Sequence, residues 1–563
     1  MSMKPLRALT TAAALGLLCT LAAGSAASTA VAAVTPSRSS PVSVSIVLPL
    51  TVPSNGEEFI SASLLESYTS PTGILTTQLD QVFDTPVTLA LDPMIIASIR
   101  VLGSSAPVSA TEWLTRLDEA DNEIFALAYA DSDLTAALQA GSRRTLDVTS
   151  LDFAIDESLF APATDDTPTA PPTGDPATDP GILPPLPTTE SLLEWDYTMT
   201  DVAWPAAASV TEKDLTALEA SGFETTILDS TNLTRGQAER ATARIGDRPV
   251  FAADAPLSGV LQSATDSKTS EGWVTALDGL EAALTGGDHS SALLTLSRDH
   301  ATGTDRLRST ITALQGAAAI EVVPLSDLPA TGSTSATLVD SPQNTIKIGH
   351  VTSMLDAEDR DIRFATVAEN PALITGNRRL ALLVALAQSP TRHPGGYGAT
   401  ASTFLDDSRS LESSVRLVKS GEILLLADRT SIYATIANDL GQPVTVTLSV
   451  RALSPLLRIE EPTVEVMVEP SSQKRAEIPV QSLSNGRVSV EATLESPTDQ
   501  QVGTTTLVRV NVQAGWEGPV TFALGAFVVL VFAGGIYRNL ILRRRPVQPS
   551  PEVPRDAGTT TDD

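Results

Sequence analysis

The stretch VSVSIVLPL, residues 42–50, is the first of eight short runs that decide the fold. Each run is rich in Val, Ile, Leu and Phe and ends in a polar or Pro-containing turn. The other runs cover residues 87–93, 124–131, 197–205, 224–230, 249–256, 292–299 and 320–328. Because these runs are apolar almost throughout, they indicate parallel strands that are covered on both faces.

Segments with a helical spacing of apolar residues separate these runs. Residues 211–221 begin at Thr211, a favourable helix cap, and stop at Gly222. Similar spacing occurs in residues 113–117, 232–245, 272–284 and 302–314. A strand–helix alternation that is repeated eight times predicts an α/β barrel-like domain, either (β/α)8 or a distorted seven-stranded form, over residues 42–329. An open doubly wound sheet is the alternative.

Two further regions depart from this alternation. Residues 161–190 hold many prolines and no basic residue, so we predict a disordered, extended insertion between the third and fourth strands. Residues 342–420 have helical spacing and are interpreted as a helical cap region. In residues 421–513, short alternating runs are separated by turn signals, which predicts an immunoglobulin-like β-sandwich that contains no cysteine.

The two ends of the sequence predict how the chain is placed at a membrane. Residues 1–33 combine a basic start, an apolar stretch and small residues, which is typical of a signal peptide. Residues 519–537 carry no charge and would span about 28 Å as a helix, close to the thickness of a bilayer core. Four arginines follow within residues 538–545. The chain is therefore expected to be a single-pass protein of the cell membrane, with a cytoplasmic tail at residues 538–563 and the large N-terminal region outside.

Composition excludes several classes of function. The chain has 67 acidic and 37 basic residues and a net charge of −30, so its surface repels nucleic acid. It has one cysteine, and its four histidines lack the spacing of a metal-ligand pair. No Gly-rich turn follows the first strands, so dinucleotide binding gains no support. We accordingly predict no metal and no cofactor.

Candidate site residues follow the predicted strands, because α/β barrels carry their reactive groups at the carboxyl ends of the strands. A glycoside hydrolase needs two carboxylates across a sugar ring, and the candidates for such a catalytic pair are Asp92, Asp131, Asp229 and Asp254. The candidates for ligand binding are Tyr129, Asp133, Trp204, Arg298 and Asp299.

Two other interpretations of these residues stay open. The sequence Asp131-Ser132-Asp133 could hold a hard cation through oxygen ligands. Alternatively, most of the aspartates cap helices, since Asp92 and Asp254 stand just before prolines and Asp133 precedes residues 134–140.

Several motifs carry a resemblance over most of residues 42–545. They are LPLTVP (48–53), LALDPMIIASI (89–99), ALAYADSD (126–133), VAWP (202–205) and FAADAPLS (251–258). In these motifs the chain resembles an uncharacterised actinobacterial envelope family, whose members are often encoded beside a homologue of the peptidoglycan-precursor flippase. The resemblance implies work in the cell envelope and supplies no catalytic residues.

Two hypotheses of function follow. The first is a non-catalytic, membrane-anchored envelope protein that binds a cell-wall glycan or an envelope membrane protein. The second is a carbohydrate-active hydrolase that uses two of the four candidate aspartates.

Overall fold

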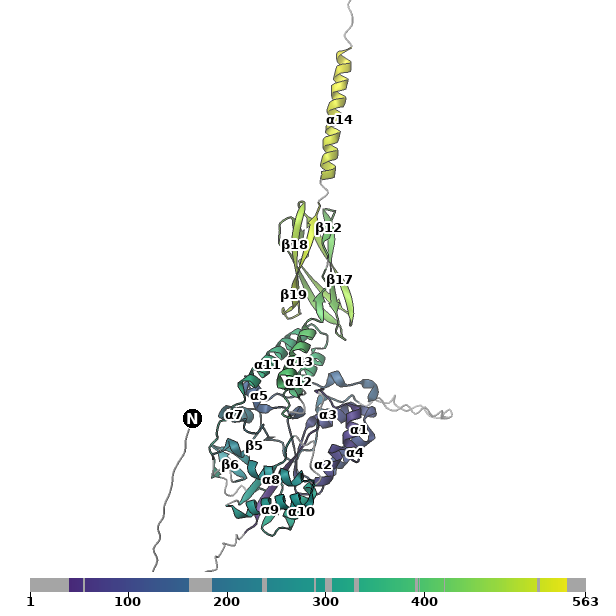
Figure 1. Ribbon diagram of the computed structural model, residues 1–563. Coiled ribbons are helices and arrows are strands. Elements are labelled where there is room, and N and C mark those ends of the chain that lie inside the picture. Colours follow the sequence, from purple (N-terminus) through teal and green to yellow (C-terminus); the bar gives the residue numbers. More distant parts are fainter. Residues whose placement is uncertain are drawn as a thin grey trace, which may run out of the picture.

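Four parts follow one another along the molecule: an α/β domain, a layer of three helices, a pair of β-sheets and a long C-terminal helix (Figure 1). The predicted signal peptide, residues 161–184 of the Pro-rich insertion and most of the cytoplasmic tail lie outside the described residues. The computed structural model describes residues 40–53, 56–160, 185–234, 240–287, 290–298, 306–328, 334–389, 393, 395–419, 421–513 and 517–543.

A curled sheet of mainly parallel strands forms the centre of the α/β domain. β1 (Val42–Leu50) is almost completely buried and pairs in parallel with β8, β2 and β9. From β1 the pairing continues on one side to β2 and β3, and on the other through β8 and β7 to β5 and β4. These strands are β2 (Thr88–Leu91), β3 (Ile124–Ala126), β4 (Val202–Ala203), β5 (Thr225–Asp229), β7 (Arg248–Ala253), β8 (Ser291–Thr295) and β9 (Ile320–Val322).

The predicted parallel sheet is thus confirmed, and one further contact joins its two ends. An isolated parallel bridge links Phe125 of β3 to Met199, which lies just ahead of β4. The backbone N–H of Met199 donates to the carbonyl of Ile124 over 3.2 Å, and the Thr198 hydroxyl also contacts Ile124. From β3 the strand contacts therefore continue through Met199 to β4, and they return to β1 through β5, β7 and β8.

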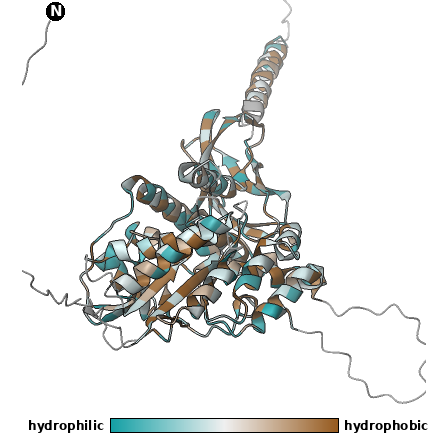
Figure 2. Ribbon diagram, turned by 60° about the horizontal axis from the view of Figure 1, so that its bottom comes forward, coloured by the Kyte–Doolittle hydropathy of each residue, from teal (hydrophilic) through white to brown (hydrophobic). Residues whose placement is uncertain are grey.

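Helices cover the sheet, and their apolar faces form its core. Figure 2 shows mainly hydrophobic residues along the central strands, between helices that also carry hydrophilic residues. The caps predicted at Asp92, Asp133, Thr211 and Asp254 are present, and Thr211 forms a capping box with Asp214. The helices are α1 (Ala62–Thr69), α2 (Ile74–Val82), α3 (Pro93–Val101), α4 (Val108–Asp118), α5 (Leu134–Gln139), α6 (Thr189–Leu193), α7 (Glu212–Ala220), α8 (Ala255–Thr265), α9 (Ser270–Gly286) and α10 (Leu307–Gly316).

The helix predicted for residues 232–245 is wrong. Residues 242–245 form β6 (Thr242–Ile245), which pairs antiparallel with β7 and in parallel with β10 (Thr334–Ser335). Gly246 and Asp247 make the two-residue turn between β6 and β7, and Gly246 has a φ of 61°. A Gly-containing two-residue turn favours a hairpin, because it needs positive φ values that other residues adopt only at a cost in energy.

Three long helices form the next layer: α11 (Thr345–Ala365), α12 (Pro371–Ala385) and α13 (Tyr397–Glu412). α12 contacts the α/β domain through Ala387, which forms an antiparallel bridge with Ser132. On the other side, Ala368, which lies between α11 and α12, forms an antiparallel bridge with Val444 of β14 (Val444–Ala452) in the sheets. The helices thus connect the α/β domain to the sheets.

Two sheets of strands that are three to twelve residues long share one aliphatic core. Two strands have no counterpart among the alternating runs of the sequence, because β11 and β15 are only three residues long and carry no clear alternation. One sheet has the order β11 (Val415–Leu417), β13 (Arg429–Asn438), β17 (Ser472–Ser482), β15 (Leu457–Ile459). The other has the order β12 (Ile423–Leu425), β19 (Gln501–Val512), β18 (Gly486–Glu495), β14 (Val444–Ala452), β16 (Thr463–Val468).

A single helix, α14 (Glu517–Leu542), extends from the far end of the sheets (Figure 1). Its segment Val520–Leu542 is long and apolar enough to cross a membrane, and none of it is buried against the rest of the described chain. The helix continues five residues beyond the predicted end at Tyr537. The residues after Arg538 are mostly apolar helix formers, and a long arginine side chain can reach toward the membrane surface from within the last turns.

Candidate functional site

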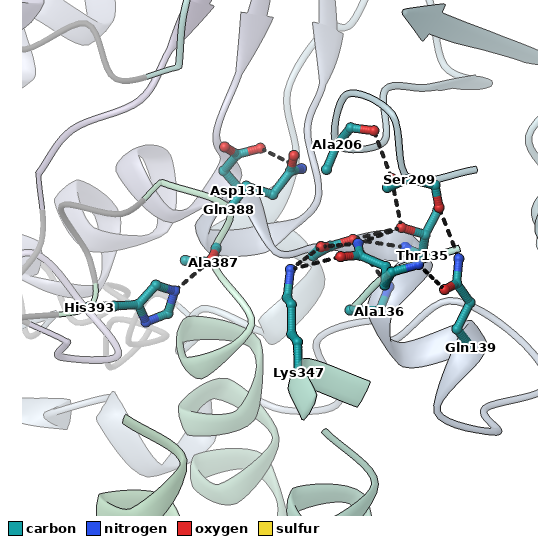
Figure 3. Close-up of polar contacts among 12 residues, drawn as sticks. Asp131, Thr135, Ala136, Gln139, Ala206, Ser209, Lys347, Ala387, Gln388 and His393 are labelled. Carbon is teal, nitrogen blue, oxygen red and sulfur yellow. Dashed lines mark hydrogen bonds and ion pairs between the residues drawn. The ribbon is translucent and has the colours of Figure 1, made fainter. Parts of the chain in front are cut away.

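The carboxyl ends of the strands lie against the end of α12, and backbone contacts fasten the two together. The N–H of Asp133 donates to the carbonyl of Leu386 over 2.8 Å. The N–H of Gln388 donates to the carbonyl of Asp131 over 3.0 Å. The segment after β3 therefore pairs with the residues that follow α12 as two short antiparallel strands would, and the predicted site residues Asp131 and Asp133 lie in this contact. Figure 3 shows Asp131 beside Gln388 there.

Asp131 is a buried carboxylate that is held by a cation. Arg298, after β8, forms an ion pair with it, and the side-chain amide of Gln388 donates to the same oxygen over 3.3 Å. Ala130 and Asp131 both have left-handed backbone conformations, with φ values of 57° and 49°. Such conformations are costly for residues other than glycine and persist only where surrounding contacts fix them. Here the carboxylate of Asp92 accepts a hydrogen bond from the N–H of Ala130 over 2.9 Å.

Arg298 also fixes Trp204, so the structure brings three of the predicted site residues together. The guanidinium carbon of Arg298 lies 4.2 Å from the centre of the Trp204 ring, and its Nη2 donates to the carbonyl of Trp204 over 2.6 Å. Phe125 packs against the same indole at a centroid distance of 6.3 Å. The Trp204 ring is therefore held by a cation–π contact and an aromatic contact, while the residue remains partly exposed.

Asp133 is fully buried and combines a helix cap with an ion pair. Its Oδ1 accepts hydrogen bonds from the N–H groups of Thr135 and Ala136, each over 3.1 Å, at the start of α5. Its Oδ2 accepts from the ammonium group of Lys347 and from the side-chain amide of Gln343, each over 2.6 Å. A cation and several donors compensate the lost hydration of this carboxylate, and the contact ties α11 to the α/β domain.

A hydrogen-bond network extends from this cap toward α7, as Figure 3 shows in part. The hydroxyls of Thr135 and Ser209 lie 3.0 Å apart, and Ser209 donates to the carbonyl of Ala206 over 2.7 Å. The amide of Gln139 donates to the carbonyl of Ser209 over 2.9 Å and to the carboxylate of Asp214 over 2.7 Å. These contacts fix the loop after β4 against α5.

Two of the four histidines flank Tyr397 at the start of α13. His393 lies 5.1 Å from the Tyr397 ring, His350 lies 6.4 Å from it, and the ammonium of Lys347 lies 5.4 Å above it. One ring nitrogen of His393 also contacts the carbonyl of Ala387 over 2.7 Å. Burial, and to a lesser degree the nearby Asp133, raise the pKa of the Tyr397 hydroxyl, so this residue is a neutral packing partner.

The remaining candidates have structural contacts of their own. Asp92 accepts from the N–H of Met94 over 3.0 Å and caps α3, and Asp254 accepts from the N–H of Leu257 over 2.9 Å and caps α8. Asp229 accepts from the N–H of Thr231 over 2.9 Å. The hydroxyl of Tyr129 donates to the carbonyl of Glu58 over 2.8 Å. Asp299 lies outside the described residues.

Two cavities open beside Trp204 and share it with Gln388 as a wall. The larger, about 470 Å³, lies at the carboxyl ends of β5, β7 and β8, and the residues that give it polar character are Asp229, Ser258, Gln262, Arg298 and Ser389. The smaller, about 310 Å³, lies beside Tyr129, Asp131 and Tyr197. Five predicted residues (Tyr129, Asp131, Trp204, Asp229 and Arg298) thus line one cavity or the other, whereas Asp92, Asp133 and Asp254 line neither.

No cation site forms at Asp131 and Asp133, because their carboxylates turn to different basic side chains. Over the described ranges, no group of three or more His, Cys, Asp and Glu side chains is placed to hold a metal ion.

Sequence reasoning missed the residues that the helical layer contributes, namely Gln343, Lys347, Gln388, His393 and Tyr397. One weak signal was present: Gln343 stands just before the cap of α11 and four residues ahead of Lys347, whose ammonium group donates to its side-chain carbonyl over 3.3 Å.

Comparison with protein families assigns the chain. A family of unknown function, DUF6049, matches residues 4–550, and the chain belongs to this family. No curated protein matches it.

Solved structures are only distantly similar. The α-amylase AmyC of Thermotoga maritima is 10% identical, and the match covers 66% of this chain and 93% of that one at a TM-score of 0.41. The native α-2-macroglobulin of Escherichia coli is 19% identical at a TM-score of 0.15, and the match covers 18% of this chain and only 6% of that one. The Caenorhabditis elegans MSP family member WR4 is 9% identical at a TM-score of 0.15, covering 18% of this chain and 99% of that one. Similarity at this level supports no inference about activity.

Proposed function

We propose that this chain is a membrane-anchored extracytoplasmic protein of the cell envelope that binds a cell-wall glycan, without catalysis, in the cavity beside Trp204. The observation that carries the proposal is the larger cavity, of about 470 Å³, in which an indole ring meets amide, hydroxyl and charged side chains. Sugar rings stack on aromatic faces through their C–H groups, while their hydroxyls need donors and acceptors around the ring.

The fixed position of the indole supports binding. Arg298 is itself held by the buried Asp131, so the Trp204 ring is oriented before any ligand arrives. A side chain that is already ordered loses little conformational entropy on binding, which favours affinity. Gln388 comes from the end of α12, so the three-helix layer contributes directly to the wall of the cavity.

The contacts of the candidate aspartates favour binding over hydrolysis. A glycosidase needs an acid and a base or nucleophile whose carboxyl groups face one another about 5–10 Å apart. Asp92 and Asp254 cap helices and line neither cavity, and Asp131 is neutralised by Arg298. Only Asp229 reaches the larger cavity, and it accepts hydrogen bonds from Thr231.

The overall architecture suits a tethered binding protein. We take the curled sheet as a distorted barrel, supported by the Phe125–Met199 bridge, and the paired sheets as an immunoglobulin-like stalk. Strands such as β19, with twelve residues, span about 40 Å at roughly 3.3 Å per residue. A stalk of that length, followed by α14 in the membrane, would hold the cavity away from the bilayer and within reach of wall polymers.

Calorimetric titration of the full-length protein in a non-ionic detergent, with soluble peptidoglycan fragments, tests the proposal. Trp204→Leu should abolish or strongly weaken binding. Trp195→Leu is the matched control and should leave binding unchanged, because Trp195 lies outside both cavities. Like Trp204, it is a half-exposed tryptophan near an arginine, with Arg100 5.9 Å from its ring centre. Equal affinity in both variants, or no heat with any fragment, would contradict the proposal. If no glycan binds and a membrane protein is instead crosslinked to the chain, a protein-binding function would replace the proposed one.

A further inference from the structure

A groove between the three-helix layer and the β-sheets is basic, although the chain as a whole carries a charge of −30. The groove has a volume of about 630 Å³. Five cationic side chains line it, and Glu412 is the carboxylate in its lining. The five are Arg360, Arg363, Arg409, Arg416 and Lys419. Because like charges repel, such a concentration of cations in an acidic protein is costly unless an anion occupies the space between them.

Internal ion pairs neutralise only part of this charge. Arg360 pairs with Glu412 over 3.0 Å, and Arg409 and Arg416 pair with exposed carboxylates. Within the described residues, Arg363 and Lys419 have no carboxylate within ion-pair distance. The position of Arg363 and Arg409 in the last turns of α11 and α13 suits the helix dipole, whereas Lys419 lies beyond the helices and gains nothing from their dipoles.

The wall opposite the helices is a strand edge. β19 pairs with β18 along most of its length but with β12 only over Val510–Val512, and its residues 501–504 and 506 border the groove. An edge that lacks a neighbouring strand presents backbone N–H groups outward. Guanidinium groups from two helices and residues of a strand edge therefore surround one space.

We propose that this groove binds a ligand that carries phosphate groups. Four of the five cations are arginines, whose planar guanidinium groups bind phosphate oxygens in pairs and keep their charge at any physiological pH. The groove lies at the end of the sheets that is remote from α14, so the headgroups of the membrane that α14 enters are out of reach (Figure 1). The ligand is then a soluble or polymer-borne phosphate rather than a lipid of that membrane. Carboxylate ligands share part of this chemistry, and the experiment separates the two.

The experiment measures binding of tripolyphosphate to the full-length protein in a non-ionic detergent by calorimetry at fixed salt concentration. Arg363→Gln/Lys419→Gln removes two cations without leaving a carboxylate unpaired, and we expect affinity to fall by about tenfold. Arg429→Gln/Arg487→Gln is the matched control. It removes the same charge from exposed arginines of the sheets outside the groove, whose ion-pair distances are 3.6 and 4.0 Å, and should leave affinity unchanged. Arg363→Lys/Lys419→Arg keeps the charge and should retain binding.

Citrate and an oligoglutamate peptide are titrated in parallel. Tripolyphosphate binding that depends on the groove variant alone supports the proposal. Binding of citrate or the peptide in preference to tripolyphosphate overturns the phosphate assignment. An equal loss of affinity in the groove variant and the control overturns the site, because the loss would then reflect overall charge alone. Absence of tripolyphosphate binding to the wild-type protein also overturns it. Unchanged melting temperatures of the variants exclude misfolding as the cause of a loss.

Discussion

The contact between the α/β domain and its helical layer differs sharply from the paired sheets in where charge is placed. At this contact the Asp133 side chain is fully buried beside Lys347, and within the helical layer itself the Asp361 side chain is likewise fully buried beside Arg378. In the sheets the core is aliphatic and the ion pairs lie at the surface, as for Arg451 and Glu491. A buried ion pair fixes how its two side chains are placed, at a high cost of desolvation, whereas a surface ion pair adds little to the free energy of unfolding. The difference indicates that the helical layer is positioned with specificity, while the sheets only have to be stable.

Removal of a buried cation should give the largest effect. Arg378→Met leaves Asp361 buried with one hydroxyl donor, Ser408 at 2.6 Å, and should destabilise the helical layer by about 3–5 kcal/mol. Arg451→Met, in the exposed pair of the sheets, should cost less than about 1 kcal/mol. Denaturant titration followed by far-UV circular dichroism measures both. Similar losses in the two variants would remove the proposed distinction between the regions.

Truncation of the aliphatic core should be the next largest effect. Ile436 of β13 is fully buried between the sheets, so Ile436→Ala should cost about 2–4 kcal/mol. Tyr433 lies on the same strand and is largely exposed, and Tyr433→Ala should cost much less. Hydrogen exchange should show faster opening of the sheets only in the first variant. Faster exchange in the α/β domain instead would mean that the two regions unfold as one unit.

Loss of Lys347 should have a smaller effect than loss of Arg378. Asp133 keeps hydrogen bonds from Gln343 and from the start of α5, so Lys347→Met should cost about 1–3 kcal/mol. Hydrogen exchange should increase at the start of α11 and at residues 131–136. Asp133→Asn/Lys347→Met removes both charges, and it should be more stable than Lys347→Met alone. If the double variant is less stable than Lys347→Met, the loss of stability in Lys347→Met does not come from an uncompensated buried charge on Asp133.

The smallest effect should come from Asp147, which lines the smaller cavity. Partial burial raises the pKa of its carboxyl group, and Arg379 offsets part of this shift. The folded protein thus binds this proton more tightly than the unfolded chain does, so the carboxyl group favours folding at low pH and loses that contribution as pH rises through its raised pKa. Asp147→Asn should therefore melt slightly above wild type at pH 7, and the difference should disappear below about pH 4. A difference that grows on acidification would reverse the assigned direction.

The parallel strands and their helices were predictable because their signals are local. Apolar runs such as Val42–Leu50 are buried on both faces, and caps such as Thr211 mark where helices begin. The hairpin of β6 and β7 was missed because the apolar spacing of residues 232–245 also fits a helix, and only the Gly246-Asp247 turn separates the two interpretations.

The candidate site was predictable only on its α/β side. Strand ends position Trp204, Asp229 and Arg298 along the sheet, and the sequence order of the strands indicates that they lie near one another. Gln388 comes from a separate layer, and no local pattern shows which helix end reaches the strands. The pairing of Asp133 with Lys347 spans more than two hundred residues and depends on the packing of that layer.

The most direct test of the central claim is hydrogen exchange of the full-length protein with and without soluble peptidoglycan fragments. The account predicts slower exchange in residues 204–207 and 295–298 and just after α12, where the cavity beside Trp204 is lined. It also predicts no change in the sheets. Protection that is confined to the sheets, or no protection at saturating fragment concentration, would contradict it.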